Sequence, residues 1–189
     1  MVEQGAVIRN AFNKETFIFS GPIDDPDVAM LEVVLEEGGT GGGNAIVHIH
    51  PFADEQFTVT SGRLKVVIAG CEQLLGPGES AVVPRGAPHY FANANDGQTA
   101  FKVEFRPAQQ HVRFFANFAT ATSKHPDWFS AQGAPKLLCI ALALDTYPDH
   151  FYVAGLPVFI QKALFAALAP IARLFGYYAE VAPRPPGDG

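Results

Sequence analysis

Apolar and polar residues alternate in short runs over the first 107 residues, and Gly, Pro, Asn and Asp separate the runs. Alternation with a period of two residues is typical of β-strands that bury one face. The alternation predicts ten strands, at residues 6–10, 16–19, 28–35, 45–50, 55–60, 64–69, 72–75, 80–83, 89–92 and 99–106. Many short strands at this spacing favour a β-sandwich or β-barrel.

The pattern changes after Pro107, where apolar residues recur at a spacing nearer to that of a helix. Three helices are predicted, at residues 109–121, 136–146 and 156–177. The charge changes at the same place, because residues 1–107 carry 14 acidic and 7 basic residues, whereas residues 108–189 carry 5 and 6. We therefore expect a β-domain over residues 1–107, a helical extension over 108–180, packed on the β-domain or at a dimer interface, and an extended, poorly packed tail over 181–189.

Composition narrows the functional classes. The 189 residues are 48% hydrophobic and 17% charged, which is enough apolar material for a folded core. The net charge of −6 leaves no basic excess to neutralise a phosphate backbone, so nucleic-acid binding is not expected. Two cysteines are too few for a disulfide scaffold, and the N-terminus shows no signal-peptide pattern, so we expect a cytoplasmic protein.

Three histidines and one glutamate form a candidate metal site. Alternation places Ile46, His48 and His50 on one face of a strand. Glu55 follows after a turn signal, so it can begin a strand that pairs back beside the first, and His89 begins another strand. A lone His or Glu on a strand is more often a surface or hydrogen-bonded residue, so the prediction depends on the set of four. Three imidazoles and one carboxylate suit one divalent transition metal such as Fe, Mn, Ni or Zn, and do not suit Ca²⁺ or Mg²⁺.

The residues around this set resemble the two motifs of the cupin superfamily. Gly42-x5-His48-x-His50-x4-Glu55-x6-Gly62 matches the first motif at each specified position, and Gly78-x5-Pro84-x-Gly86-x2-His89-x3-Asn93 matches the second. The resemblance covers roughly residues 28–106 and is to single-domain, quercetinase-like small metal-dependent cupins. It implies a mainly β fold, a double-stranded β-helix (cupin or jelly-roll) barrel, here with a C-terminal α-helical extension. It also implies that His48, His50, Glu55 and His89 are the metal ligands, and that the motif Gly, Pro and Asn residues are structural turn and strand positions.

Strand alternation also predicts the wall of a substrate pocket beside the ligands. The residues expected to point inward are Ile46, Phe57, Val59, Phe91, Phe101, Val103 and Phe105. No Arg or Lys is expected among them, so an anionic substrate such as a phosphosugar or dicarboxylate would lack a fixed cation. We therefore expect a small apolar or aromatic ligand that an oxygen atom orients on the metal. The alternative is that these side chains simply fill the barrel.

The predicted function is metal-dependent oxygenation. A substrate enol or phenol would bind through its oxygen and lose its proton, and Glu55 could serve as both ligand and catalytic base. This chemistry resembles that of small cupin dioxygenases, which are oxidoreductases, but a fold does not determine a function. The alternative is a non-catalytic small-ligand-binding or sensing cupin with a structural metal. His111, His125 and His150 lie outside the motifs, and we interpret them as solvated or structural.

The C-terminal helix, expected within residues 156–178, is apolar around most of its circumference. Lys162 and Arg173 bracket only ten uncharged residues and Pro170 interrupts them, so a membrane span is not expected. Three placements stay open: packing on the barrel, burial in a homodimer, and contact with a membrane surface, with the last the least favoured. The phenylalanines divide accordingly. Phe57, Phe91, Phe101 and Phe105 are expected around the metal, and those at 114, 115, 118, 159, 165 and 175 on a helical packing surface.

Overall fold

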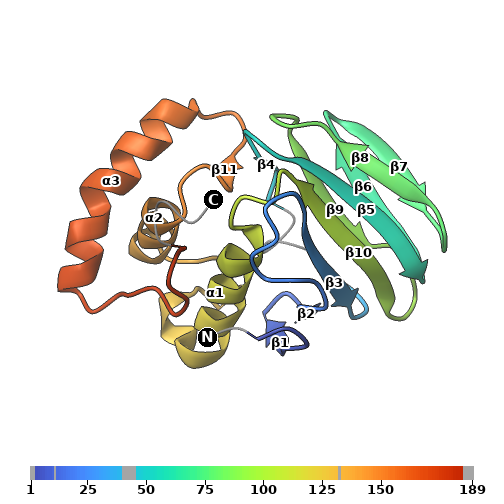
Figure 1. The fold of residues 1–189 in the computed structure, drawn as a ribbon, viewed down its shortest axis with the longest axis horizontal. Coiled ribbons are helices and arrows are strands. Elements are labelled where there is room, and N and C mark those ends of the chain that lie inside the picture. The colour runs from blue at the N-terminus through green and yellow to red at the C-terminus, as the bar shows by residue number, and fades with distance from the viewer. Residues whose placement is uncertain (1–2, 11, 40–45, 132, 185–189) are drawn as a thin grey trace.

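The computed structural model describes residues 3–10, 12–39, 46–131 and 133–184, and in these residues eleven strands form two antiparallel sheets (Figure 1). The first sheet has the strand order β1-β2-β3-β10-β5-β8 and the second the order β11-β4-β9-β6-β7. The first sheet contains β1 (Val7–Asn10), β2 (Glu15–Ile18), β3 (Ala29–Leu35), β10 (Thr99–Arg106), β5 (Asp54–Ser61) and β8 (Ser80–Val83). The second contains β11 (Tyr152–Val153), β4 (His48–Ile49), β9 (His89–Asn93), β6 (Leu64–Ile68) and β7 (Cys71–Leu75).

The helices gather on one side of the two sheets (Figure 1). They are α1 (His111–Lys124), the short 3-10 helix Pro126–Trp128, α2 (Leu137–Thr146) and α3 (Val158–Leu174). Helix α1 packs against β1 and β3, whereas α3 lies farthest from the sheets and packs along α2. The C-terminal helix is therefore held within the chain mainly by another helix, and Gln161 also hydrogen-bonds β11 at the edge of the second sheet. No described helix is long and apolar enough to cross a membrane.

The mainly β fold with two jelly-roll sheets and a C-terminal helical extension is the predicted one. Each of the ten predicted strands has a counterpart, and β8 and β10 have the predicted bounds. The strand expected over 45–50 is only β4, although residue 45 lies outside the described residues, as does Gly42 of the first motif. Strand β11 was not predicted, because two residues between helical segments give no periodicity to detect.

Period-two burial explains why the inner strands form. In β3 and β10 every second residue is buried, and β10 pairs with β3 on one side and with β5 on the other. The inward residues of these strands, among them Leu31, Val33, Phe101 and Val103, join one core cluster. Burying this apolar surface is the main favourable contribution to folding of the β-domain.

The motif residues outside the ligand set hold turns and strand ends, as the resemblance implies. Gly62 has φ 78°, and a Cβ there would lie 2.5 Å from Thr99 Oγ1 and 2.6 Å from the Gln98 carbonyl oxygen. Only glycine fits this turn between β5 and β6. Asn93 donates its amide protons to the Glu36 and Gly97 carbonyl oxygens, and so ties the end of β9 to the segments beside β3 and β10.

The expectation of a poorly packed C-terminal tail is wrong for its first residues. Val181 is buried in the main core cluster, and its carbonyl oxygen accepts a hydrogen bond from the Tyr147 hydroxyl. Asn117 on α1 accepts the Val181 backbone N–H, and Gln110 accepts that of Arg184. Polar side chains of α1 thus bind the tail through its backbone, which a sequence pattern does not reveal. Residues 185–189 lie outside the described residues.

Candidate metal centre

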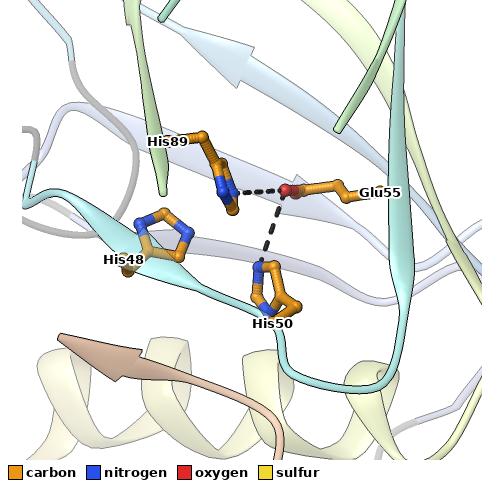
Figure 2. A group of neighbouring side chains, drawn as sticks. All are labelled: His48, His50, Glu55 and His89. Carbon is orange, nitrogen blue, oxygen red and sulfur yellow. Dashed lines mark ion pairs between the residues drawn. The ribbon is translucent and has the colours of Figure 1, made fainter. Parts of the chain in front are cut away.

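Three histidines and one glutamate converge between the two sheets (Figure 2). His48 lies on β4, His50 follows that strand, Glu55 lies near the start of β5, and His89 begins β9. The antiparallel register places His48 directly opposite His89. All four side chains are buried, and one ligand atom from each lies within 4.8 Å of the others. The structure therefore brings together all four residues that the sequence predicts as metal ligands.

The free atoms of this group face one another. Glu55 Oε2 lies 2.7 Å from His89 Nε2 and 3.5 Å from His50 Nε2. In the described part of the chain, none of these three buried atoms makes a hydrogen bond of ordinary geometry. Buried polar atoms are nearly always satisfied, so a convergent set of unsatisfied nitrogens and oxygens is what a metal ion would fill. The chemistry of the donor set fits a divalent transition metal.

The backbone orients each imidazole. The Nδ1 atom of His48 donates to the Ile46 carbonyl oxygen at 2.9 Å, and that of His89 donates to the Ala87 carbonyl oxygen at 2.9 Å. His50 Nδ1 donates in the same way to the carbonyl oxygen of His150. Because the Nδ1 protons are engaged, the Nε2 lone pairs are free to bind a metal, and outer-shell hydrogen bonds of this kind fix the ring orientation at metal sites.

Burial sets the charge of the group. It lowers the pKa of His48 to about 3, with a further contribution from His89, and it lowers the pKa of His50 well below its ordinary value. These two rings are therefore neutral at pH 7, which is the form that binds metals. Burial acts in the same direction on His89, but hydrogen bonding and attraction from Glu55 outweigh it, so the pKa of His89 is raised.

The helical extension completes the site. Strand β11 pairs with β4, with Val153 opposite His48 and Tyr152 opposite Ile49. Phe151 stacks on the His48 ring with the ring centroids 4.7 Å apart. The buried Gln161 of α3 accepts the Val153 N–H at 3.1 Å and donates to its carbonyl oxygen at 2.9 Å, which fixes β11 in place. The segment after α2 is therefore part of the metal centre.

A cavity of about 230 Å³ adjoins the ligands, because His48 and Glu55 are in its wall. Among the described residues that line it, the other polar side chain is Glu15, and none is Lys or Arg. The wall is otherwise apolar and includes six phenylalanines: Phe17, Phe91, Phe114, Phe115, Phe118 and Phe151. The pocket is smaller than the roughly 300–1,000 Å³ of pockets for drug-sized ligands, and its lining suits a small apolar or aromatic molecule.

The cavity wall differs from the predicted one. Ile46, Phe91 and Val103 line the cavity, as expected from alternation. The other four predicted wall residues are buried in the core and are not in the wall: Phe57, Val59, Phe101 and Phe105. Phe57 and Phe101 pack against Phe91, and Phe105 stacks on His111 with centroids 4.1 Å apart. Alternation identifies inward positions, but it does not distinguish those that neighbours cover from those that face a cavity.

The extension supplies wall residues that sequence reasoning assigned elsewhere. Phe114, Phe115 and Phe118 of α1 line the cavity, although we expected them on a packing surface. Glu15 was missed because the predicted strand began one residue later. Its spacing of two from Phe17 was an available signal, since both then share one strand face.

The histidines outside the motifs are structural rather than solvated. His111 and His150 are buried, and His125 pairs with Glu180 at 2.8 Å. His150 contributes its backbone carbonyl to the metal centre, which no side-chain pattern indicates.

Comparison with known proteins finds a family match and several similar solved structures. The sequence model of the cupin domain family matches residues 31–103. Similar solved structures include KdgF from Halomonas sp., with 18% identity over 55% of this chain and 88% of that one at a TM-score of 0.47. A Streptomyces nucleoside dehydratase, Pac13, has 16% identity over 57% of this chain and 80% of that one at a TM-score of 0.45. A cupin-superfamily sugar phosphate isomerase from Silicibacter pomeroyi has 26% identity over 52% and 63% at 0.44.

Comparison with curated proteins found no match. The matched domain contains His48, His50, Glu55 and His89 in the motif spacing and in one buried group. Residues 31–103 are therefore a cupin domain, and its buried His48, His50, Glu55 and His89 form a group that could hold a metal.

Proposed function

We propose that this cupin is a metal-dependent dioxygenase of small, uncharged, apolar or aromatic substrates that bind through an oxygen atom. The observation that carries the proposal is the apolar cavity whose wall includes His48 and Glu55. A ligand in this cavity lies directly against two members of the metal-ligand group. The proposal concerns Fe, Mn or Ni, because Zn²⁺ has no redox chemistry.

The wall selects against charged substrates. An anion that leaves water must find a fixed cation or a dense set of hydrogen-bond donors, and the described lining offers no Lys or Arg. Phenylalanine rings, by contrast, gain contact with an apolar body, and ring pairs add roughly 0.5–1.5 kcal/mol beyond area burial. An enol or phenol meets both conditions, since it has an apolar body and one ionisable oxygen.

The residues of the chain would prepare the substrate for oxidation. A bound transition metal would supply Lewis-acid polarisation and one-electron chemistry with dioxygen. Glu55 would accept the proton of the substrate hydroxyl. Burial keeps His48 and His50 neutral, which is the form that binds a metal. The phenylalanine wall excludes water from the reacting oxygen. Both atoms of dioxygen enter the product, so the reaction needs no external reductant.

The test measures metal content and oxygen uptake together. Protein purified without a chelating tag is analysed for metal, reconstituted separately with Fe²⁺, Mn²⁺ and Ni²⁺, and assayed on a panel of catechols and flavonols with ¹⁸O₂. We expect uptake with one metal and two labelled oxygens in the product. Glu55→Gln should lose the activity, and Glu32→Gln on the outward face of β3 should keep it.

The second candidate is a non-catalytic ligand-binding or sensing cupin with a structural metal. It is favoured by the lining, in which the described polar side chains are restricted to Glu15, His48 and Glu55. Stoichiometric zinc in the purified protein, with ligand binding and no oxygen uptake under any of the three metals, would overturn the dioxygenase proposal in favour of this one.

A further inference from the structure

A second acidic residue, Glu15, lines the cavity and lies outside the metal-ligand group. Glu15 is 1% exposed. Its Oε2 atom has no hydrogen-bond partner in the described residues. The described cavity wall contains no Lys or Arg that could pair with it. A buried carboxyl oxygen without a partner destabilises a fold, because it loses its hydration and gains no hydrogen bond in return.

The surroundings of Glu15 are also polar and incompletely satisfied. Asn10 lies directly opposite Glu15 in the β1-β2 pair, and Asn13 lies in the turn between these strands. Both asparagines are buried, and the Nδ2 atoms of both are without partners in the part of the chain that the structure describes. Asn10 has a structural role, because its Oδ1 accepts the Phe12 backbone N–H at 3.2 Å. No comparable hydrogen bond of Asn13 or of Glu15 Oε2 is present in the described residues, so apolar side chains would pack these two positions at lower cost.

The strand register places Glu15 far from Glu55. Glu15 is opposite Leu35 at one end of β3, and Leu35 is opposite Thr99 of β10. At the other end, Ala29 and Glu55 both pair with Phe105 of β10. The two ends of β3 are six residue steps apart, which corresponds to roughly 20 Å along the strand. Glu15 and Glu55 nevertheless line the same cavity.

Burial also determines the charge of the Glu15 carboxyl. Burial raises the pKa of Glu15 to about 8. The neighbouring Asn13 side chain partly offsets this rise, although its side-chain atoms make no hydrogen bond of ordinary geometry. At pH 7 the group is therefore mostly a neutral carboxylic acid. In this form it donates one hydrogen bond and accepts another, as a hydroxyl group on a ligand requires.

We propose that Glu15 binds a hydroxyl group at the end of the substrate remote from the metal centre. The substrate is then an elongated, uncharged molecule with an apolar body along the phenylalanine wall and an oxygen-bearing group at each end. One oxygen reaches the His48 and Glu55 end of the cavity, and the other replaces the missing hydrogen-bond partner of Glu15. Glu15 is thus a specificity-determining residue. This inference rests on the proposed function, because it extends the same substrate class.

The test compares ligands that differ by one terminal hydroxyl. Protein loaded with redox-inert Zn²⁺ is titrated by calorimetry with 4-hydroxybiphenyl and 4,4′-dihydroxybiphenyl, and with the corresponding longer pair, 4-hydroxystilbene and 4,4′-dihydroxystilbene. We expect the diol of at least one pair to bind about tenfold more tightly than its mono-hydroxyl partner. The preference should disappear in Glu15→Met, largely persist in Glu15→Gln, which retains a donor and an acceptor, and be unchanged in the outward-facing control Glu32→Met.

A stability measurement separates this role from a structural one. If Glu15 is kept for ligand binding, Glu15→Met removes an unsatisfied carboxyl and raises the Tm of the ligand-free protein by about 5 °C. A fall in Tm would show that the carboxyl supports the fold and would overturn the proposal. Glu32→Met provides the baseline for the same change on the other face of the sheet.

The remaining outcomes distinguish this proposal from the proposed function. Equal binding of mono-hydroxyl and diol ligands in both pairs would overturn the role of Glu15 and leave the substrate class intact. The protein could instead bind 4′-aminomethyl-4-hydroxybiphenyl more tightly than the diol and lose this preference in Glu15→Gln. Glu15 would then bind a cation rather than a hydroxyl group, which would also overturn the proposal. If no ligand binds the wild-type protein at millimolar concentration, the substrate class itself is wrong, and the proposal is overturned with it.

Discussion

His50 donates its Nδ1 proton to the backbone carbonyl oxygen of His150, which lies 100 residues later in the chain. One partner belongs to the cupin motif and the other to the helical extension. Because this bond fixes the direction of His50 Nε2, the extension takes part in shaping the metal centre rather than merely covering it. Metal affinity should therefore depend on residues far from the motifs.

The four ligand residues should determine metal binding. We expect His89→Ala to weaken Mn²⁺ and Zn²⁺ binding by more than the 10- to 100-fold typical of outer-shell changes, because it removes one of four donors. Isothermal titration of metal-free protein measures the effect. His125→Ala is the control, since that imidazole pairs with Glu180 outside the group. Unchanged affinity in His89→Ala would show that the metal binds elsewhere.

Gln161 should couple α3 to the metal centre. Its side chain makes three hydrogen bonds, at 2.9–3.1 Å, with the backbone of Val153 and Leu156. Gln161→Leu leaves these buried groups unsatisfied, so the free energy of unfolding should fall by about 2–4 kcal/mol. Metal affinity should fall on the order of tenfold, because β11 is no longer held beside His48.

Urea unfolding and metal titration of the same Gln161→Leu sample provide the two readouts. The exposed Gln73 on β7 offers the matched control, and Gln73→Leu should leave both values close to those of wild type. A destabilised variant with wild-type metal affinity would contradict the coupling and restrict Gln161 to a role in folding.

Glu15 should make the protein less stable as the pH rises. With a pKa of about 8 in the folded state against an ordinary value of 4.5, the folded state binds more protons than the unfolded state between these values. Its contribution to the free energy of unfolding is therefore undiminished below pH 4.5, falls as the pH rises to 8, and is then constant. The total change is several kcal/mol at about 1.4 kcal/mol per pKa unit.

The difference between wild type and Glu15→Gln isolates this contribution, because other titrating groups are common to both proteins. Urea unfolding at pH 5, 6, 7, 8 and 9 should show the wild type losing stability relative to the variant over this range. A difference that does not change with pH would mean that Glu15 titrates near its ordinary value.

Helix α3 should mediate self-association. Its exposed apolar side chains include Phe159 and Leu174, which are 73% and 83% exposed. Lys162 is paired with Asp149 and Arg173 with Asp145, so the basic residues of α3 are neutralised within the chain and are poorly suited to anionic lipid headgroups. We therefore expect this face to bind a second copy of the chain, which is one of the placements that the sequence left open.

Sedimentation equilibrium checks this expectation. The wild type should be a dimer, and Phe159→Glu with Leu174→Glu should be a folded monomer, because neither side chain is buried in the chain. Val82→Glu on β8 places the same charge on an exposed apolar site outside α3 and should keep the dimer. A monomeric wild type that co-sediments with phosphatidylserine vesicles would instead support the membrane-surface placement.

Local patterns predicted ten of the eleven described strands and the ligand set, but not β11. Alternation predicted the observed bounds of β8 and β10, because every second residue of each strand is buried. The spacing of His48, His50, Glu55 and His89 was likewise local information. Alternation did not predict that Phe57 and Phe105 lie outside the cavity wall. Both side chains point inward, but rings from other elements pack over them, and alternation within one strand does not reveal such contacts.

The sequence by itself determined the two-sheet cupin fold and the identity of the four candidate ligands, because strand periodicity and motif spacing follow from neighbouring residues. Only the tertiary structure decided what surrounds them. It brought three phenylalanines of α1 into the cavity wall, placed β11 beside β4, and put Glu15 in the lining, where its Oε2 has no hydrogen-bond partner among the described residues. These relationships join segments as much as 105 residues apart, and the packing of the helical extension, rather than any local pattern, brings such segments together.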